Sequence, residues 1–335
     1  MLEIVEAGLL TTVQDGGRPA AVGLGVPAGG ASDQRSQAVA NALLGNEPDA
    51  AALEMTLAGA TLRARADCVV AIAGAEMTGR LVDAGLPAPA GAAVVLRDGE
   101  TLAFGVCREA SGVRTYLAVG GGVDVPPVLG SRSTCLVGGF GGLDGRPLRA
   151  GDVIRPAGAA AATAATAATA AMAAIAAEWP GPASPRRGGG VQELRVVAGP
   201  HLDRLPEEAL ARLLETRWTV SGRGDRQAIR LGGAPLPTGG ASLLSAGVVW
   251  GAVQLPPDGI PLVLLADHQT VGGYPVAAVV IRADLPLLGQ LAAGDEVRFA
   301  AVDLATARRA LDEQLASWSA AQRQLGTDAN AGQFA

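Results

Sequence analysis

The sequence contains no lysine, because all 26 of its basic residues are arginine. This absence excludes the chemistries that require a lysine amine: the phosphate-binding lysine of a P-loop, a Schiff-base nucleophile and the lysine that carries biotin. A compositional bias towards arginine explains the absence most simply, and the exclusions hold whatever its cause. If biotin takes part in the chemistry, a partner protein must carry it.

Aromatic residues, cysteine and histidine are also scarce. The 335 residues include four Phe, four Trp and two Tyr, so the core must consist mainly of Val, Leu, Ile and Ala. Cys68, Cys107 and Cys135 are far apart and odd in number, which is typical of reduced thiols in the cytoplasm. With only His201 and His268 and no CxxC motif, we expect no metal site.

The charge distribution excludes two further classes of partner. The net charge is −6 and the longest basic run is Arg186-Arg187, so we expect no nucleic-acid partner. The first ten residues, MLEIVEAGLL, carry acidic residues where a signal peptide is positive, which favours a cytoplasmic protein. Residues 157–177 are free of charge but consist mainly of Ala and Thr, so we expect no membrane span.

Residues 157–190 differ in composition from the rest of the chain. An Ala/Thr-rich run is followed by WPGPASPRRGGG (179–190), which predicts a low-complexity linker, with a surface helix as the alternative. The linker would divide the chain into an N-terminal half, 1–156, and a C-terminal half, 191–300. Because it carries little apolar surface, we expect a short Gly/Ser replacement to leave the melting temperature nearly unchanged.

Short Val-rich runs bounded by Gly, Pro or Asp predict strands in both halves. Three segments have helical periodicity and end signals instead. The predicted strands are CVVAIAG (68–74), AAVVLRDG (92–99), VRTYLAVGG (113–121), LRVVAG (194–199), RWTVSG (217–222), GVVWGAVQL (247–255), PLVLLAD (261–267) and VAAVVIR (276–282), and the predicted helices are 33–44, 206–214 and 305–325.

Five blocks in a fixed order carry a resemblance to a known family. The chain resembles the C subunit of bacterial 5-oxoprolinase, also described as the KipA or allophanate hydrolase subunit 2 family, which is related to the carboxyltransferase part of urea amidolyase. The blocks are TTVQDGGRPAAVGLGVPAGGASD (11–33), ANALLGNEPDAAALEMTLAG (40–59), TYLAVGGGVDVPPVLGSRSTCLVGGFGG (115–142), GVVWGAVQLPPDGIPLVLLADHQTVGGYP (247–275) and IRADLPLLGQLAAGDEVRF (281–299).

The resemblance implies a β-rich α+β fold with a cyclophilin-like β-barrel architecture. The expected organisation is a carboxyltransferase-like half at 1–156, the linker at 157–190, a second β-rich half at 191–300 and a C-terminal helix at 301–325. The resemblance also implies partners, a KipI-like B subunit and a lactam-utilisation-type A subunit. Together these hydrolyse 5-oxoproline to L-glutamate with ATP, whose site on the complex is unknown.

Two other functions are compatible with the resemblance. In urea amidolyase the equivalent module moves a carboxyl group from biotin to urea, and a KipA-type protein antagonises a KipI-like kinase inhibitor. The chain also departs from the family pattern. It reads RGDRQAIRLG over 223–232, where Arg226 and Arg230 remain but an apolar–Gly–aromatic stretch is missing, and Val271 replaces a threonine. These departures put the usual ligand of the C-terminal half in question.

Two segments supply the candidate substrate-binding residues. In the C-terminal half these are Gln269, Thr270, Gly272, Gly273 and Tyr274, which follow a predicted strand. Adjacent glycines let backbone N–H groups approach a ligand, and the Gln and Thr side chains add hydrogen bonds. The alternative is a tight turn with a buried tyrosine.

In the N-terminal half the candidates are Gln14, Asp15, Arg18, Arg132 and Ser133. The alternative for the first three is a turn locked by an ion pair between Asp15 and Arg18. Arg132 offers a bidentate clamp for a carboxylate, with a buried structural arginine as the alternative.

We expect one pocket in which the turn 269–275 meets Arg132 or Arg18. His268 is a candidate proton carrier. Asp33, Asn41, Asn46 and Glu54 fall in the family blocks, where caps and turns explain them equally well. No Ser-His-Asp or Cys-His arrangement can be assigned, so no catalytic residue is predicted.

Overall fold

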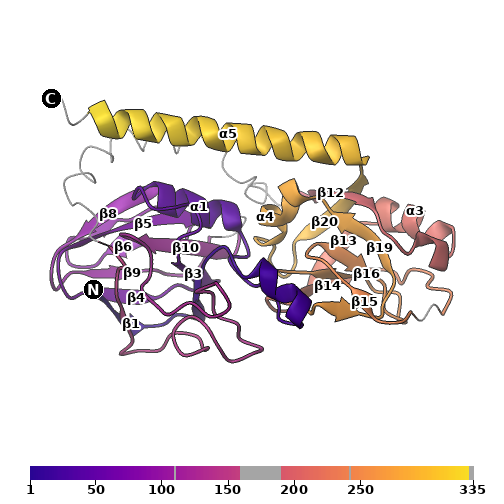
Figure 1. Cartoon of the computed structure of the whole chain (residues 1–335), viewed down its shortest axis with the longest axis horizontal. Helices are drawn as coiled ribbons and strands as arrows, with labels where there is room; N and C mark the ends of the chain where they lie inside the picture. Colours follow the sequence, from indigo (N-terminus) through magenta and orange to yellow (C-terminus); the bar gives the residue numbers. More distant parts are fainter. Residues whose placement is uncertain (109–110, 159–189, 241–242, 332–335) are drawn as a thin grey trace. The chain divides into compact units, whose positions relative to one another are not determined.

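The structure is a computed structural model that describes residues 1–108, 111–158, 190–240 and 243–331 (Figure 1). The predicted linker lies almost entirely outside these residues. The described chain forms two compact units. The first contains residues 1–18, 29–158 and 316–331, and the second contains residues 19–28 and 190–315.

The first unit contains two antiparallel sheets. The six-stranded sheet has the order β11-β1-β4-β9-β6-β7 and the five-stranded sheet the order β2-β3-β10-β5-β8. The strands of the first sheet are β11 (Val153–Ile154), β1 (Leu2–Glu6), β4 (Thr61–Ala64), β9 (Thr101–Ala103), β6 (Arg80–Leu81) and β7 (Leu86–Pro87). Those of the second are β2 (Leu10–Gln14), β3 (Ala52–Thr56), β10 (Arg114–Val119), β5 (Cys68–Gly74) and β8 (Ala92–Leu96).

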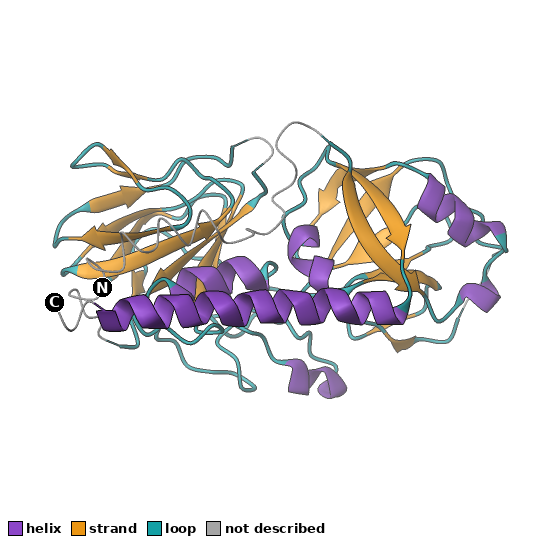
Figure 2. Ribbon diagram, turned by 90° about the horizontal axis from the view of Figure 1, so that it is seen from above, coloured by secondary structure: helices purple, strands orange, loops and turns teal. Residues whose placement is uncertain are grey.

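The core of the first unit lies between its two sheets. Ile4 and Leu62 of one sheet and Leu53 and Leu117 of the other belong to the same buried apolar cluster. Helix α1 (Gln34–Ala42) covers the opposite face of the five-stranded sheet, over β10 and β5 (Figure 2). Because β10 is covered on both faces, all six of its residues are buried.

The second unit is a closed barrel with the strand order β12-β19-β16-β17-β14-β13-β20. Its strands are β12 (Gln192–Ala198), β19 (Val276–Val280), β16 (Ala252–Gln254), β17 (Leu262–Leu264), β14 (Ala228–Gly232), β13 (Trp218–Gly224) and β20 (Glu296–Ala301). The pair β12–β20 is parallel, and the remaining neighbours in the barrel pair antiparallel. Closure leaves no free sheet edge.

Apolar side chains fill the barrel. Trp218 is fully buried among them, and its Nε1 donates to the carbonyl of Leu213 at 3.0 Å. Leu213 belongs to α3 (Glu208–Glu215), which the tryptophan therefore ties to the barrel. The remaining elements are the ribbon of β15 (Ala246–Gly247) and β18 (Val271–Gly272), the helices α4 (Leu285–Leu288) and α5 (Leu304–Ala331), and the 3-10 turns η1 (Pro19–Leu24), η2 (Leu202–Arg204) and η3 (Arg282–Asp284).

The predicted β-rich α+β fold with a barrel is confirmed. Of the two described units, only the second is closed, whereas the first is a two-sheet sandwich. Each of the eight predicted strand segments contains a strand, and the three predicted helices correspond to α1, α3 and α5. None of the helices in the described ranges has the length and apolarity needed to cross a membrane.

Candidate functional site

The carboxylate of Asp15, directly after β2, organises one end of the first unit. Its Oδ1 accepts hydrogen bonds from the backbone N–H of Gly17 at 2.8 Å and from the hydroxyls of Ser131 at 2.6 Å and Ser133 at 2.5 Å. Its Oδ2 accepts from the backbone N–H of Arg132 at 2.5 Å. Asp15 therefore fixes the loop that carries Arg132, and its four bonds make it a positioning group.

Arg132 is half-buried, and its Nε donates to the carbonyl of Val125 at 2.9 Å. Its terminal nitrogens, Nη1 and Nη2, have no hydrogen-bond partner among the described residues. With its backbone held by Asp15 and its Nε held by Val125, the guanidinium is oriented before any ligand arrives. Two terminal nitrogens that point the same way suit a carboxylate or another planar anion.

Arg18 is a buried cation, with 1% of its surface exposed. Its Nε donates to the carbonyl of Val128 at 3.3 Å, its Nη2 donates to the carbonyl of Ser133, and its guanidinium carbon lies 5.1 Å from the centre of the Phe140 ring. The ion pair with Asp15 considered from the sequence does not form, because carbonyls and a ring hold the guanidinium instead. Its Nη1 has no hydrogen-bond partner within the described ranges.

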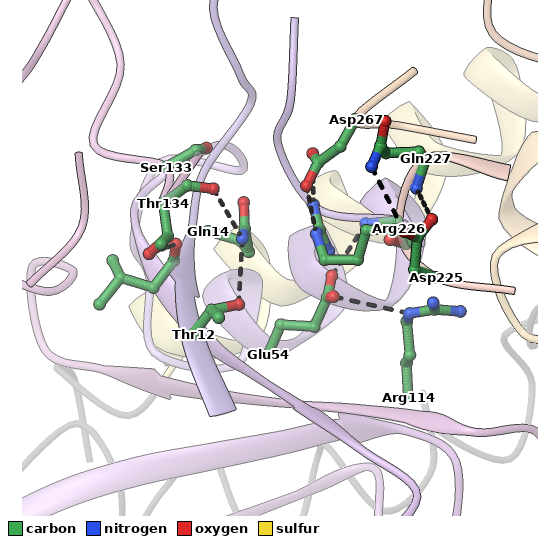
Figure 3. A network of polar contacts seen from close by, with 12 residues as sticks. Thr12, Gln14, Glu54, Arg114, Ser133, Thr134, Asp225, Arg226, Gln227 and Asp267 are labelled. Carbon is green, nitrogen blue, oxygen red and sulfur yellow. Dashed lines mark hydrogen bonds and ion pairs between the residues drawn. The ribbon is translucent and has the colours of Figure 1, made fainter. Parts of the chain in front are cut away.

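Gln14 is fully buried at the end of β2. Its Nε2 donates to the hydroxyl of Thr12 at 3.0 Å and to the carbonyl of Thr134 at 3.4 Å (Figure 3). The structure thus brings together all five candidates predicted in the N-terminal half, which are Gln14, Asp15, Arg18, Arg132 and Ser133.

A second buried polar cluster in this unit surrounds Glu54 of β3. Its Oε2 accepts from the hydroxyl of Tyr116 at 2.8 Å and from the backbone N–H of Ser32 at 2.9 Å. Its Oε1 lies 3.5 Å from Nε of Arg114 (Figure 3). Burial, reinforced by the charge of Glu54, raises the pKa of Tyr116 well above its usual value. Tyr116 therefore remains a neutral donor at every physiological pH.

The predicted cap is confirmed for Asp33, whereas Asn41 lies inside α1 and Asn46 lies in the loop that follows the helix. Asp33 is the N-cap of α1, where its Oδ1 accepts from the backbone N–H of Ser36 at 2.9 Å. The Nδ2 of Asn41 donates to the carbonyl of Ala50 at 2.8 Å, and the Nδ2 of Asn46 donates to Oδ1 of Asn41 at 3.0 Å. These side chains hold the α1–β3 connection.

In the second unit, the segment 269–275 contributes β18 to a two-stranded ribbon with β15. Gln269 and Tyr274 are exposed, whereas Thr270 is buried. The alternative of a tight turn around a buried tyrosine is therefore wrong. Neither Gly272 nor Gly273 has a positive φ, so these glycines are needed for space and not for a left-handed backbone.

Gln254 of β16 lies beneath this ribbon and was not predicted from the sequence. It is fully buried, and its Oε1 accepts from Nε2 of Gln269 at 3.5 Å. Its Nε2 has no hydrogen-bond partner in the part of the chain that the structure describes. The segment GVVWGAVQL (247–255) gives no sign that Gln254, its one polar side chain, is covered by a ribbon that forms later in the chain.

Arg226 and Asp267 form a buried ion pair in the second unit. The guanidinium binds the carboxylate through Nε–Oδ2 at 2.9 Å and Nη2–Oδ1 at 3.1 Å, and both side chains are less than 5% exposed (Figure 3). The pair joins the β13–β14 turn to the segment after β17. Arg226 thus keeps a defined partner within the 223–232 stretch that departs from the family pattern, and the more exposed Arg230 pairs with Asp258.

His268 follows Asp267, and its Nδ1 lies 2.6 Å from the carbonyl oxygen of Gln269. Burial lowers the pKa of the imidazole below its usual 6.5, although the carbonyl and Asp267 partly oppose this shift. The ring is therefore neutral at neutral pH and donates from Nδ1 to the carbonyl.

Comparison with known proteins identifies the family. A model described as the carboxyltransferase domain, subdomain A and B, matches residues 24–301. The chain belongs to this family. It is 37% identical to the C subunit of 5-oxoprolinase from Escherichia coli K12, over 94% of this chain and 95% of that protein.

Two solved structures extend the comparison. The urea amidolyase of K. lactis superposes with a TM-score of 0.81 at 28% identity, over 94% of this chain and 19% of that one. The protein TTHA0988 superposes with a TM-score of 0.74 at 38% identity, over 89% of this chain and 56% of that one. In both proteins the region similar to this carboxyltransferase-family chain is therefore one part of a longer polypeptide.

The candidate residues of this carboxyltransferase-family chain form two groups of different chemistry. The first unit presents oriented guanidinium groups, and the second presents side-chain amides. One pocket that combines Gln269 with Arg132 or Arg18 stays a prediction. No group of three or more His, Cys, Asp or Glu side chains in the described ranges is arranged to hold a metal ion.

Proposed function

We propose that this chain is the C-type subunit of a complex that hydrolyses the lactam 5-oxoproline to L-glutamate with ATP. The observation that carries the proposal is the 37% identity to the C subunit of E. coli 5-oxoprolinase, which extends over nearly the whole of both chains. The partners are a KipI-like B subunit and a lactam-utilisation-type A subunit, and ATP binds to the assembled complex.

The chemistry of the candidate residues supports a substrate of this class. 5-Oxoproline carries one carboxylate and one cyclic amide. Arg132 offers two terminal nitrogens without a partner among the described residues, which suit the carboxylate. Gln269 is exposed at the ribbon of the second unit and offers both a donor and an acceptor for the amide.

A second function, that of a carboxyltransferase component, is favoured by the family model and by the likeness to urea amidolyase. In this function the chain transfers a carboxyl group from biotin to a small acceptor such as urea. Because the sequence contains no lysine, the biotin belongs to a partner protein.

The two functions are distinguished by reconstitution. We expect the chain to co-purify with a co-expressed B-type subunit in about equal amounts, since the relatives TTHA0988 and urea amidolyase carry further segments in the same chain. Adding the A-type subunit should give glutamate from 5-oxoproline in the presence of ATP. Each subunit is omitted in turn as a control. Carboxylation of urea with a biotin-bearing partner, without 5-oxoproline hydrolysis, would favour the second function instead.

Arg132→Gln tests the contact with the carboxylate. The variant loses a charged hydrogen bond to the carboxylate, which contributes about 1.5–3 kcal/mol. We therefore expect the KM of Arg132→Gln for 5-oxoproline to be roughly 10- to 100-fold higher than that of wild type. The matched control is Arg149→Gln, because Arg149 is exposed on the same unit. An unchanged KM in Arg132→Gln would assign this arginine to structure alone.

A further inference from the structure

The side chain of Gln254 lies in apolar surroundings outside the barrel core. Its neighbours along the chain, Val253 and Leu255, point into the core, so Gln254 faces the opposite side of β16. On that side, Val248, Ala252, Leu264 and Val276 form a small apolar cluster. A neutral glutamine at this position brings two donors and one carbonyl oxygen into an environment that offers few partners.

The hydrogen bonds of Gln254 are incomplete. Its Oε1 is 3.5 Å from Nε2 of Gln269, at the outer limit for a hydrogen bond, and its Nε2 has no partner among the described residues. An unsatisfied buried amide destabilises a fold, and most buried polar groups are paired. A methionine or leucine would fill the same volume without this penalty. The stability of the fold therefore does not explain the side-chain amide of Gln254, and we look for a function in ligand binding instead.

The backbone of Gly272 packs closely against this amide. A Cβ atom at position 272 would lie 2.8 Å from Nε2 of Gln254, 3.4 Å from Cγ1 of Val248 and 3.5 Å from Nε2 of Gln269. The glycine has no positive φ, so its small size and not its backbone freedom is what the position requires. Both amide nitrogens thus converge beside a backbone that carries no side chain.

We propose that Gln254 and Gln269 form a subsite for the N–C=O edge of a small amide ligand. Nε2 of Gln254 donates to the carbonyl oxygen of the ligand, and Oε1 of Gln269 accepts from its N–H. A lactam and a cyclic urea present the same edge, with C=O and N–H on one side. The exposed side chain of Gln269 covers Gln254 and rotates to admit the ligand.

This subsite deepens the proposed function, because it adds a recognition residue for the amide of the substrate. It also explains why a buried, incompletely bonded glutamine and a glycine lie together. The competing explanation is a single buried water on Nε2 of Gln254, which would satisfy the donor without any ligand.

The test uses the full chain and a set of small ligands in calorimetric titrations. The set contains 5-oxoproline, 2-pyrrolidinone, 2-imidazolidinone, and proline, which has the ring and the carboxylate but no ring carbonyl. We expect wild type to bind the compounds that carry the amide edge more tightly than proline. Tighter binding of 2-imidazolidinone than of 2-pyrrolidinone would identify a ureido ligand, and the reverse order a lactam.

Gln254→Met removes the donor at similar volume. We expect it to weaken binding of the amide ligands about 3- to 10-fold, as the loss of one neutral hydrogen bond implies, and to leave proline binding unchanged. The same variant should melt at a higher temperature than wild type, because it removes an unsatisfied polar group. Gln227→Met is the control, since the Gln227 side chain bonds to the exposed Asp225 and lies outside the ribbon.

A higher melting temperature with unchanged ligand binding in Gln254→Met would overturn the proposal and leave the water as the explanation. Absence of binding of every amide compound to wild type would overturn it too. Gly272→Ala places a methyl group against Nε2 of Gln254 and should weaken the same ligands. If the amide ligands bind as expected but the reconstituted complex releases no glutamate, the proposed function fails and the subsite stands.

Discussion

Substitution of Asp15 by alanine should destabilise the first unit through the loop at 131–133. The carboxylate accepts four hydrogen bonds, two from backbone N–H groups and two from serine hydroxyls, in a half-buried position. At about 0.5–1 kcal/mol for each bond, their loss costs roughly 2–4 kcal/mol. For a unit of this size, that lowers the melting temperature by roughly 4–16 °C.

Scanning calorimetry on the full chain measures this effect, provided that the transition of each unit is followed separately. We expect Asp15→Ala to lower only the transition of the first unit. Asp15→Asn should have a smaller effect, because one amide oxygen still accepts while the amide nitrogen opposes an N–H donor. The control Asp124→Ala removes an exposed carboxylate that makes no hydrogen bond among the described residues of the same unit, and it should leave the transition nearly unchanged.

The reasoning is refuted if Asp15→Ala melts within about 2 °C of wild type, since the loss of all four bonds should lower the melting temperature by at least about 4 °C. In that event the serine and backbone donors find other acceptors, and the loop does not depend on Asp15.

Three further predictions concern pH, packing and thiol reactivity. The pKa of His268 is lowered in the folded state, so below about pH 6.5 the unfolded chain binds more protons than the folded chain. The stability of the fold therefore falls as the pH decreases towards 5. His268→Gln should make this fall shallower when melting is measured as a function of pH. Gly233→Ala places a Cβ 2.8 Å from the Trp218 ring and should destabilise the second unit by about 1–3 kcal/mol in calorimetry, whereas Gly222→Ala, with no atom within 4 Å, should not. Burial raises the pKa of Cys107 to about 11, so its alkylation by iodoacetamide at pH 8, followed by mass spectrometry, should be roughly a hundredfold slower than in the unfolded chain.

The sequence was sufficient wherever the signal is local. The N-cap Asp33 predicted α1, and both ends of this helix lie within a few residues of the prediction. The periodicity of the C-terminal segment predicted α5, which begins near the predicted residue but extends to Ala331. The strands were predicted from short Val-rich runs. Their partners were not, because the sheet orders pair β1 with β11 and β12 with β20, which are far apart in the chain.

The candidate site shows the same division. The family blocks pointed to Asp15 and Ser133, but the bonds between them span 118 positions, so no local pattern could reveal a shared carboxylate. Gln254 was missed for a related reason. Its burial depends on β18, which follows 17 residues later. Gly272 of that strand hints at the close packing, but a glycine suggests backbone freedom more readily than a need for space.

The two groups of candidate residues differ in the part of a ligand that each suits, and this difference separates the two functions. Arg132 suits an anion, whereas Gln254 and Gln269 suit a neutral amide edge. Among the ligands considered, 5-oxoproline has both groups, urea has only the amide edge, and 2-pyrrolidinone is a lactam without a carboxylate. If the predicted pocket that combines Gln269 with Arg132 forms, the chain should bind 5-oxoproline more tightly than 2-pyrrolidinone, and Arg132→Gln should remove that preference without weakening 2-pyrrolidinone. If wild type has no such preference, the oriented guanidinium serves a partner or the fold, and a neutral acceptor such as urea fits the amide subsite better.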